Sequence, residues 1–209
     1  GWGLTECCAA CTTNPPWANK LGTIGKPLPG LNIEIWDEDN KPLPQGKVGQ
    51  IAVSGPTVME GYLTEDGPVD AGLYKTEDGT KWVLTGDLAY IDEDGYLWFM
   101  GRSKRLVIIS GYNVYPGDIE KLLTELDFIK ESCAVQGFDA EGKKLIRLYV
   151  VADGADENAE EYNRQIIELC SARLDKFSVP RDIRYIDALP RTRLEKVDFM
   201  SLTENEPTK

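Results

Sequence analysis

Aromatic and charged side chains occur beside glycines at several points of the chain, in segments typical of ligand-binding turns. GWGLTE opens the sequence with Trp2 and Glu6, TGD contains Asp87, and GRSKR contains Arg102. An aromatic face suits a purine, a carboxylate suits a hard cation or a vicinal diol, and a guanidinium directs several donors at ligand oxygens. Taken singly, each segment is equally typical of a strand, a turn or a solvated basic loop. Only their order along the chain, together with Lys196 in PRTRLEKVDF, gives a specific signal.

Histidine is absent, and this excludes several kinds of site within the chain. Ser-His-Asp catalysis, Cys-His catalysis and His-ligated zinc all require it. The CCAAC segment resembles part of a metal site, but no second CxxC motif supplies the remaining ligands. We therefore expect five structural, reduced thiols in a cytoplasmic protein, because their number is odd and no secretory signal is visible. The cysteines are Cys7, Cys8, Cys11, Cys133 and Cys170.

The composition is that of an ordinary globular protein with an acidic surface. Of 209 residues, 42% are hydrophobic and 28% are charged, and the net charge is −12. A surface of this charge disfavours nucleic acid and anionic membranes as partners, although it leaves a nucleotide ligand possible, because local amides, a lysine and Mg²⁺ can offset its phosphates. No apolar run approaches the ~18 residues of a transmembrane helix, so we expect no membrane-spanning segment.

The first hundred residues predict short strands and turns. Residues 31–41 alternate apolar and polar side chains, 48–55 form another strand candidate, and 82–101 predict a hairpin around Asp94-Gly95. Glycine and proline are dense between these segments, which favours a small distorted β-barrel over a helical bundle.

Helices and strands mix only in the second half, so we place a boundary near 102–104. An apolar strand at 105–110 precedes a Gly-Tyr-Asn loop and a helix beginning at Pro116. A second helix carries Tyr162, Ile166, Cys170 and Leu174 along one side, and the tail from Thr203 is expected to fray. The expected segments are strand 105–110, helix 116–126, strands 130–138 and 144–152, the second helix, and strand 181–187.

Together, GWGLTE, LTGDLAYID, GRSKRLVIISGYNVYP and LPRTRLEKVDF resemble the carboxyl-terminal half of adenylate-forming enzymes of the acyl-CoA synthetase type. The resemblance covers essentially the whole chain but less than half of such an enzyme, and Gly1 falls inside a motif, so we expect a piece of a longer protein. It implies an α+β fold. Residues 1–101 would be the distorted β-barrel subdomain of the large N-terminal lobe, 102–104 the hinge, and 105–209 a small mixed α+β domain.

The resemblance assigns nucleotide-binding roles in the first half. Trp2 would lie near the adenine, Thr5 would contact the α-phosphate, and Glu6 would help hold Mg²⁺. Asp87 would accept hydrogen bonds from both ribose hydroxyls, and Arg102 would contact the ribose and phosphate region. These residue types suit ATP and AMP as ligands.

In the second half, the resemblance implies a moving lysine. Lys104 matches the hinge position, Gly111 matches the loop glycine that passes close to the pantetheine of CoA, and Lys196 matches the lysine that bridges the acyl carboxylate and the α-phosphate. A fixed ammonium there would stabilise the charge that develops during adenylation. Glu195 departs from the family, which generally has glycine at this position, and its carboxylate could compete for the Lys196 ammonium.

The resemblance implies an ATP-dependent acid–thiol ligase that forms acyl-AMP and then a CoA thioester, with a long-chain fatty acid as the expected carboxylic acid. The family's phosphate-binding loop is missing from this chain, so we expect the chain alone to be inactive and to require the remainder of the N-terminal lobe. Two alternatives stay open. One is a ligase or adenylation domain that loads a carrier protein instead of CoA, and the other is a non-catalytic nucleotide-binding or interaction module.

Overall fold

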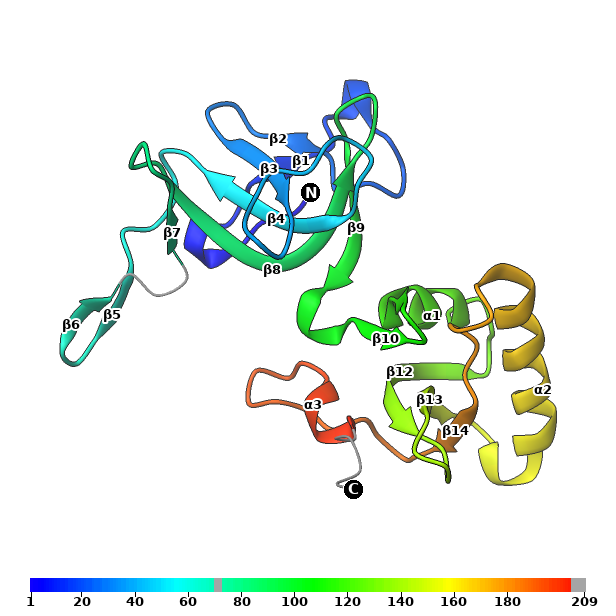
Figure 1. Ribbon diagram of the computed structural model, residues 1–209. Coiled ribbons are helices and arrows are strands. Elements are labelled where there is room, and N and C mark those ends of the chain that lie inside the picture. The colour runs from blue at the N-terminus through cyan, green and yellow to red at the C-terminus, as the bar shows by residue number, and fades with distance from the viewer. Residues whose placement is uncertain (70–72, 204–209) are drawn as a thin grey trace. The chain divides into compact units, whose positions relative to one another are not determined.

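Strand β8 (Lys81–Ile91) is the centre of the first of two units into which the chain divides, Gly1–Lys104 and Arg105–Lys209. The computed structural model describes residues 1–69 and 73–203. β8 belongs to a five-stranded antiparallel sheet, which Figure 1 shows as a curved surface. Its partners are β4 (Gly49–Ser54), β7 (Leu73–Lys75) and β9 (Leu97–Arg102), and β3 (Asn32–Trp36) pairs with the far edge of β4.

The curl of this sheet arises from irregularities in β8 and its partners. The register shifts between Gln50 and Ala52 where β4 meets β8, and again between Leu88 and Ala89 where β8 meets β9. Bulges of this kind bend a strand and increase its twist. The result is a curled half-barrel whose concave core contains mainly aliphatic side chains and two cysteines, namely Cys7, Cys11, Leu31, Ile33, Ile35, Ile51, Val53, Val83, Ala89 and Leu97.

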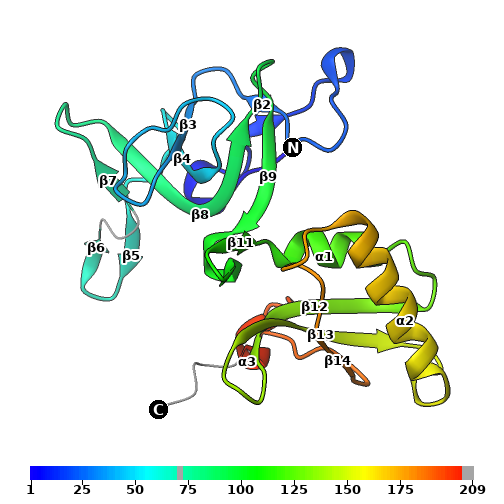
Figure 2. The ribbon, with the colours of Figure 1, turned by 45° about the vertical axis from the view of Figure 1, so that its right-hand side comes forward.

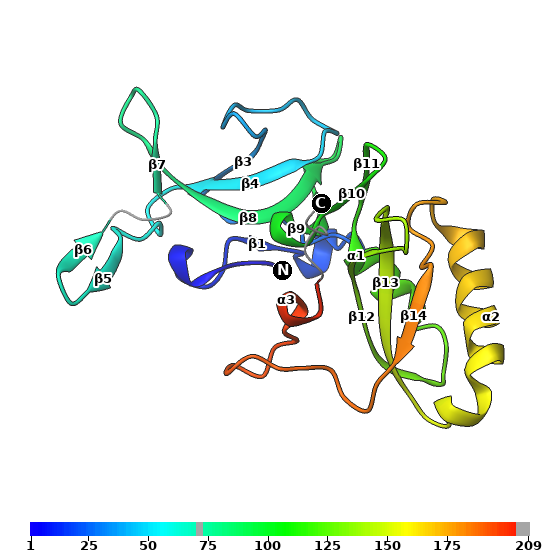
Figure 3. The same ribbon diagram turned by 60° about the horizontal axis from the view of Figure 1, so that its bottom comes forward.

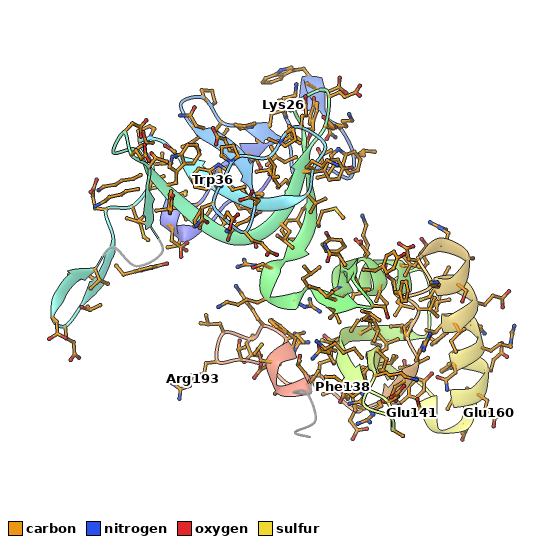
Figure 4. The ribbon with its side chains drawn as sticks, viewed as in Figure 1. Lys26, Trp36, Phe138, Glu141, Glu160 and Arg193 are labelled. Atoms are coloured by element: carbon orange, nitrogen blue, oxygen red, sulfur yellow. The ribbon has the colours of Figure 1, made fainter. Side chains whose placement is uncertain are left out.

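Short elements complete the first unit. β1 (Thr12–Thr13) pairs with β2 (Lys26–Pro27), and β5 (Tyr62–Thr64) forms a hairpin with β6 (Gly67–Val69). Single 3₁₀ turns span Thr5–Cys7 (η1), Pro16–Ala18 (η2) and Ser103–Arg105 (η3). All five tryptophans of the chain belong to this unit. Figure 4 marks one of them, Trp36, on the curled sheet, where its ring packs against Trp82 and Tyr74.

The second unit is a three-stranded sheet with helices on both faces. β12 (Ile129–Phe138) and β13 (Lys144–Ala152) are antiparallel, and β14 (Asp182–Tyr185) runs parallel to β13. Helices α1 (Pro116–Leu123) and α2 (Ala155–Arg173) pack with Ala134 and Ile146, and they lie side by side in Figure 2. The short helix α3 (Phe199–Leu202) packs against Cys133 and Val135. Figure 3 shows α3 and α2 on opposite sides of the sheet. No helix among the described residues combines the length and the apolar content needed to cross a membrane.

The mixed α+β character expected from the sequence is confirmed, and so are the predicted strands at 31–41, 48–55, 82–101, 130–138, 144–152 and 181–187, with shifts at their ends. One prediction was wrong in part: of the expected Gly-Tyr-Asn loop, only Gly111 lies in a turn, and Tyr112 and Asn113 belong to a strand. β10 (Val107–Ile109) pairs with β11 (Tyr112–Val114) across a two-residue turn, in which Ser110 and Gly111 have φ of 51° and 82°. Two positive φ angles are what a tight type I′ hairpin requires. The expected fraying tail lies outside the described residues after Thr203.

The predicted helix 116–126 is shorter than expected and ends at Leu123. The Thr124 hydroxyl donates to the Lys121 carbonyl at 2.7 Å, which satisfies one of the free carbonyls at the helix end. Leu126 still packs against the core of the unit, from the turn that follows. Its apolar character therefore reflects burial and not helical structure.

Arg105 connects the start of the second unit to the interior of that unit through hydrogen bonds. Its guanidinium forms two hydrogen bonds with the Glu120 carboxylate and donates to the Ala134 carbonyl at 3.3 Å. Glu120 also accepts from the Ala134 N–H at 2.9 Å, and the Phe199 ring lies 5.1 Å from the guanidinium carbon. This partly buried network joins α1, β12 and α3 to the residue that follows Lys104.

Candidate nucleotide-binding site

The amino-terminal turn places Trp2, Thr5 and Glu6 at the edge of the curled sheet. Trp2 forms an isolated bridge with Thr12, and η1 follows with Thr5 exposed and Cys7 fully buried. A Cβ at Gly3 would lie 1.7 Å from the Ala9 carbonyl oxygen, so the turn can close only with glycine at this position. The buried Cys7 thus anchors the turn while its neighbours stay accessible.

Asp87 brings Trp2 and Arg102 together. The Trp2 indole N–H donates to Asp87 Oδ2 at 2.8 Å, and Arg102 Nε lies 2.6 Å from Oδ1. The Asp87 side chain is only 4% exposed, whereas that of Arg102 is 61% exposed. Within the described part of the chain, no donor reaches Oδ1 with hydrogen-bond geometry. Burial raises the pKa of Asp87, while the Trp2 hydrogen bond and the Arg102 charge oppose that rise.

The local backbone explains the position of Asp87. Gly86 has φ of 70°, a conformation that favours glycine, and its N–H donates to Gln50 Oε1 at 2.8 Å. The Asp87 N–H donates to the Thr85 hydroxyl at 3.1 Å. Asp87 and Arg102 are direct partners in the β8–β9 ladder, so the hairpin itself holds the two charges opposite each other.

Glu6 is held by a residue from a distant hairpin. The Tyr62 hydroxyl donates to Glu6 Oε1 at 2.5 Å, and the Met59 N–H donates to the Glu6 carbonyl at 2.8 Å. The Tyr62 hydrogen bond is the main cause of a lowered pKa of Glu6, and the Arg102 charge acts in the same direction. The carboxylate is therefore ionised at neutral pH, as a ligand for a hard cation must be.

The remaining predicted residues lie in η3 and in the second unit. Lys104 is exposed within η3, and Gly111 is the second residue of the β10–β11 turn, with no atom within 4 Å of an added Cβ. Gly111 has φ of 82°, a left-handed conformation that favours glycine. Lys196 is exposed in a loop that returns on itself: the Thr192 N–H donates to the Lys196 carbonyl at 2.7 Å, and the Lys196 N–H donates to the Thr192 hydroxyl at 3.3 Å. Figure 4 labels Arg193 at the outward tip of this loop.

Glu195, immediately before Lys196, has φ of 59°. Its N–H donates to the Thr192 carbonyl at 3.0 Å, so the segment is a tight turn followed by a left-handed residue. That position favours glycine, because a Cβ is strained there. The loop therefore keeps a glycine-type conformation although it carries glutamate.

A basic cavity beside Ser110 was not predicted from the sequence. It has a volume of about 310 Å³ and lies next to the Gly111 turn. Its lining combines three cations with apolar and polar groups, namely Ile109, Ser110, Lys143, Lys144, Leu145, Phe177 and Arg181. The adjacent lysines of GKKL were a visible signal, but Arg181 joins them only through the fold.

Two family models match the chain. Residues 1–63 match the AMP-binding enzyme model, and residues 118–196 match the model of the AMP-binding enzyme C-terminal domain. The chain belongs to the AMP-binding enzyme family.

Individual relatives in the family are CoA ligases. The chain is 32% identical over 207 residues to a long-chain-fatty-acid–CoA ligase of Yersinia pestis, covering 99% of this chain and 35% of the relative. It also aligns with the O-succinylbenzoate coenzyme A synthetase of Bacillus subtilis. The solved structure in complex with AMP gives a TM-score of 0.80 at 30% identity, covering 99% of this chain and 41% of that one. The complex with ATP and magnesium ion gives a TM-score of 0.76 at 30% identity, covering 93% of this chain and 39% of that one. The chain thus spans about a third of the length of the curated relative.

The residues of the first unit fit a magnesium ion only in combination with a nucleotide. The described residues contain no cluster of three or more carboxylate, thiol or imidazole ligands. Mg²⁺ in nucleotide sites is commonly held by one or two carboxylates together with phosphate oxygens and water. Glu6, ionised and fixed by Tyr62, suits the role of that single carboxylate.

Proposed function

We propose that this chain is part of an ATP-dependent acid–thiol ligase. A carboxylate attacks the α-phosphate of ATP, forming acyl-AMP and releasing pyrophosphate. The CoA thiol then attacks the acyl carbon, forming acyl-CoA and releasing AMP. The observation that supports this function best is the buried Asp87 carboxylate, which brings together two other residues of the expected site, with the Trp2 indole at Oδ2 and the Arg102 guanidinium at Oδ1.

In this function, each residue of the first unit has a role that its position supports. The two ribose hydroxyls donate to Asp87, because an acceptor-only carboxylate matches a vicinal diol. The accessible Arg102 guanidinium contacts the ribose and phosphate, and Trp2 lies near the adenine. Thr5, exposed at the start of η1, contacts the α-phosphate. Glu6 holds Mg²⁺, which offsets the phosphate charge when it is bound.

The second unit supplies the catalytic lysine and the CoA contacts. Lys196 bridges the acyl carboxylate and the α-phosphate during adenylation, and its exposure in a loop makes it available to a ligand. Lys104 is the hinge about which the small domain turns after adenylation. Gly111 then passes close to the pantetheine. The neighbouring basic cavity, with Lys143 and Arg181, suits the phosphates of CoA.

The domain roles form part of the proposal. Residues 1–101 are the distorted β-barrel subdomain of a larger N-terminal lobe, 102–104 are the hinge, and 105–209 are the small domain. The rest of the lobe supplies the phosphate-binding loop and the acyl pocket, so this chain alone does not adenylate. We propose a long-chain fatty acid as the substrate, by analogy with the Yersinia pestis relative. Five free thiols support the cytoplasm as the compartment.

Separate assays of the two half-reactions test the proposal. In the full-length enzyme, Lys196→Ala should slow adenylation by about 100-fold or more, because removing one fixed charge-stabilising group costs about that much. Thioester formation from supplied acyl-AMP and CoA should be largely retained. Arg193→Ala is the matched control, since Arg193 is an exposed cation in the same loop.

Equal losses in both half-reactions, or a similar loss for the Arg193 variant, would contradict the role of Lys196. Thioester formation with a carrier protein but not with CoA would show that CoA is not the acceptor and that the carrier-protein alternative is correct. Acyl-AMP formation by the 209-residue chain alone would contradict the need for the missing lobe.

A further inference from the structure

The contact between Tyr62 and Glu6 joins residues that are 56 positions apart in the sequence. We propose that Tyr62 is a positioning residue that aims the Glu6 carboxylate at the Mg²⁺ of the bound nucleotide. This inference rests on the proposed function, in which Glu6 is the metal ligand. It adds a residue of the β5–β6 hairpin to the site.

The geometry leaves one carboxylate oxygen for the metal. Tyr62 donates to Oε1 at 2.5 Å, a length typical of a hydroxyl bound to an ionised carboxylate. Among the described residues, no other residue donates a hydrogen bond to Oε2, and the Glu6 backbone N–H is the carboxylate's remaining donor. The hydrogen bond also restricts the side-chain rotamers of Glu6, which on an exposed turn would otherwise be free to vary. Metal-binding carboxylates are usually oriented by hydrogen bonds of this kind.

The backbone supports the same arrangement. Met59, three residues before Tyr62, donates its N–H to the Glu6 carbonyl at 2.8 Å. On the other side, the fully buried Cys7 fixes η1 in the core of the first unit. Glu6 is therefore held at its main chain by Met59 and Cys7 and at its carboxylate by Tyr62.

The exposure of the hairpin argues against a purely structural role for the tyrosine. Tyr62 is 44% exposed and its neighbour Leu63 is 85% exposed. Neither belongs to a core cluster of the first unit. A hydroxyl on such a hairpin contributes little to folding, so its contact with Glu6 is better explained by the orientation of that carboxylate.

The test measures how ATP binding to the full-length enzyme depends on Mg²⁺. Isothermal titration calorimetry with ATP over a range of Mg²⁺ concentrations would compare wild type with Tyr62→Phe, which removes only the hydroxyl. We expect the Mg²⁺ concentration for half-maximal enhancement of ATP affinity to rise by about tenfold, the lower end of the effect of losing such a partner. ATP affinity without Mg²⁺ should not change. Adenylation should show the same shift and recover at saturating Mg²⁺.

Two further variants separate the possible failures. Tyr74→Phe removes a hydroxyl from β7 of the same unit and should match wild type. Glu6→Gln should abolish most of the Mg²⁺ dependence. If Glu6→Gln shifts the dependence and Tyr62→Phe does not, Tyr62 has no positioning role, although the proposed function stands. If Glu6→Gln has no effect either, Glu6 is not the metal ligand, and both this inference and that part of the proposed function are wrong.

Discussion

The Trp2 indole donates a hydrogen bond to the Asp87 carboxylate across 85 positions of sequence. This bond joins the amino-terminal turn to the centre of the curled sheet. It also connects two segments that the sequence offered as separate ligand-binding motifs. Because Asp87 faces Arg102 in the same ladder, three of the predicted nucleotide-binding residues form one group before any ligand is considered.

Asp87→Asn should stabilise the protein at neutral pH while weakening nucleotide binding. Burial raises the pKa of Asp87 in the folded state, so its ionised form costs free energy there. The stability linked to the neutral acid is present below the ordinary aspartate pKa of about 3.9 and is lost as the pH rises through the higher folded value. Asparagine does not ionise. Its free energy of unfolding should exceed that of wild type by about 1 kcal/mol at pH 7, and the difference should vanish in acid.

Urea unfolding at several pH values measures this difference, and ATP binding to the full-length enzyme measures the functional loss. Asp39→Asn is a suitable control, because Asp39 is exposed. A less stable Asp87 variant at pH 7 would show that its ion pair with Arg102 outweighs the cost of burial.

Glu195→Gly should stabilise the second unit. Glu195 has φ of 59°, where a Cβ costs about 1–2 kcal/mol, and part of that gain is offset by the greater flexibility of glycine in the unfolded chain. We expect a net increase of about 0.5–1 kcal/mol in the free energy of unfolding. Glu195→Ala distinguishes the effect of backbone strain from the effect of the charge, since it removes the carboxylate but keeps the Cβ. If the free energy of unfolding rises equally in the alanine and glycine variants, the gain comes from removing the charge and not from relieving the strained φ.

Arg105→Ala should destabilise the second unit by about 2–3 kcal/mol. Arg105 and Glu120 are 23% and 20% exposed, so the substitution leaves a largely buried carboxylate without its cation. Arg164→Ala, on the exposed surface of α2, breaks ion pairs with Glu161 and Glu168 and should cost far less. Urea unfolding followed by circular dichroism would compare them. Equal losses of unfolding free energy in the two variants would mean that the Arg105 network stabilises the protein no more than a surface ion pair does.

Only one of the five thiols should react in the native protein. Cys8 is exposed, while Cys7, Cys11, Cys133 and Cys170 are buried. Burial raises the pKa of Cys133 to about 12 and that of Cys170 to about 11, which keeps both protonated at neutral pH. Alkylation at pH 8, followed by mass spectrometry, should add one label to the native chain and five after denaturation. Rapid labelling of Cys133 in the native state would contradict its burial.

The strands and helices were largely predictable because their apolar patterns are regular. The tight turn at 110–111 was missed, although Ser-Gly between two apolar runs is a turn signal. The sequence offered SGYN as a loop because the polar residues Tyr112 and Asn113 follow. In the structure these residues are exposed positions of a two-stranded hairpin, where polar side chains are ordinary.

The pairing of Asp87 with Arg102 could not be predicted from the hairpin alone. The register shifts by one residue between Leu88 and Ala89. Without that bulge, the ladder would place Gly101 opposite Asp87. A bulge depends on contacts across the whole sheet, so the alternation of a single strand does not reveal it. The Tyr62–Glu6 contact was also missed. It joins residues 56 positions apart, and nothing in the GYLTEDG segment indicates Glu6 as a partner.

The uneven distribution of tryptophan has a practical consequence. All five indoles belong to the unit that carries Asp87, whereas α1, α2 and α3 all belong to the other. Fluorescence emission therefore monitors the first unit, and helical ellipticity monitors the second, in one unlabelled sample. Denaturation curves recorded by both signals would reveal whether the halves melt cooperatively or one after the other.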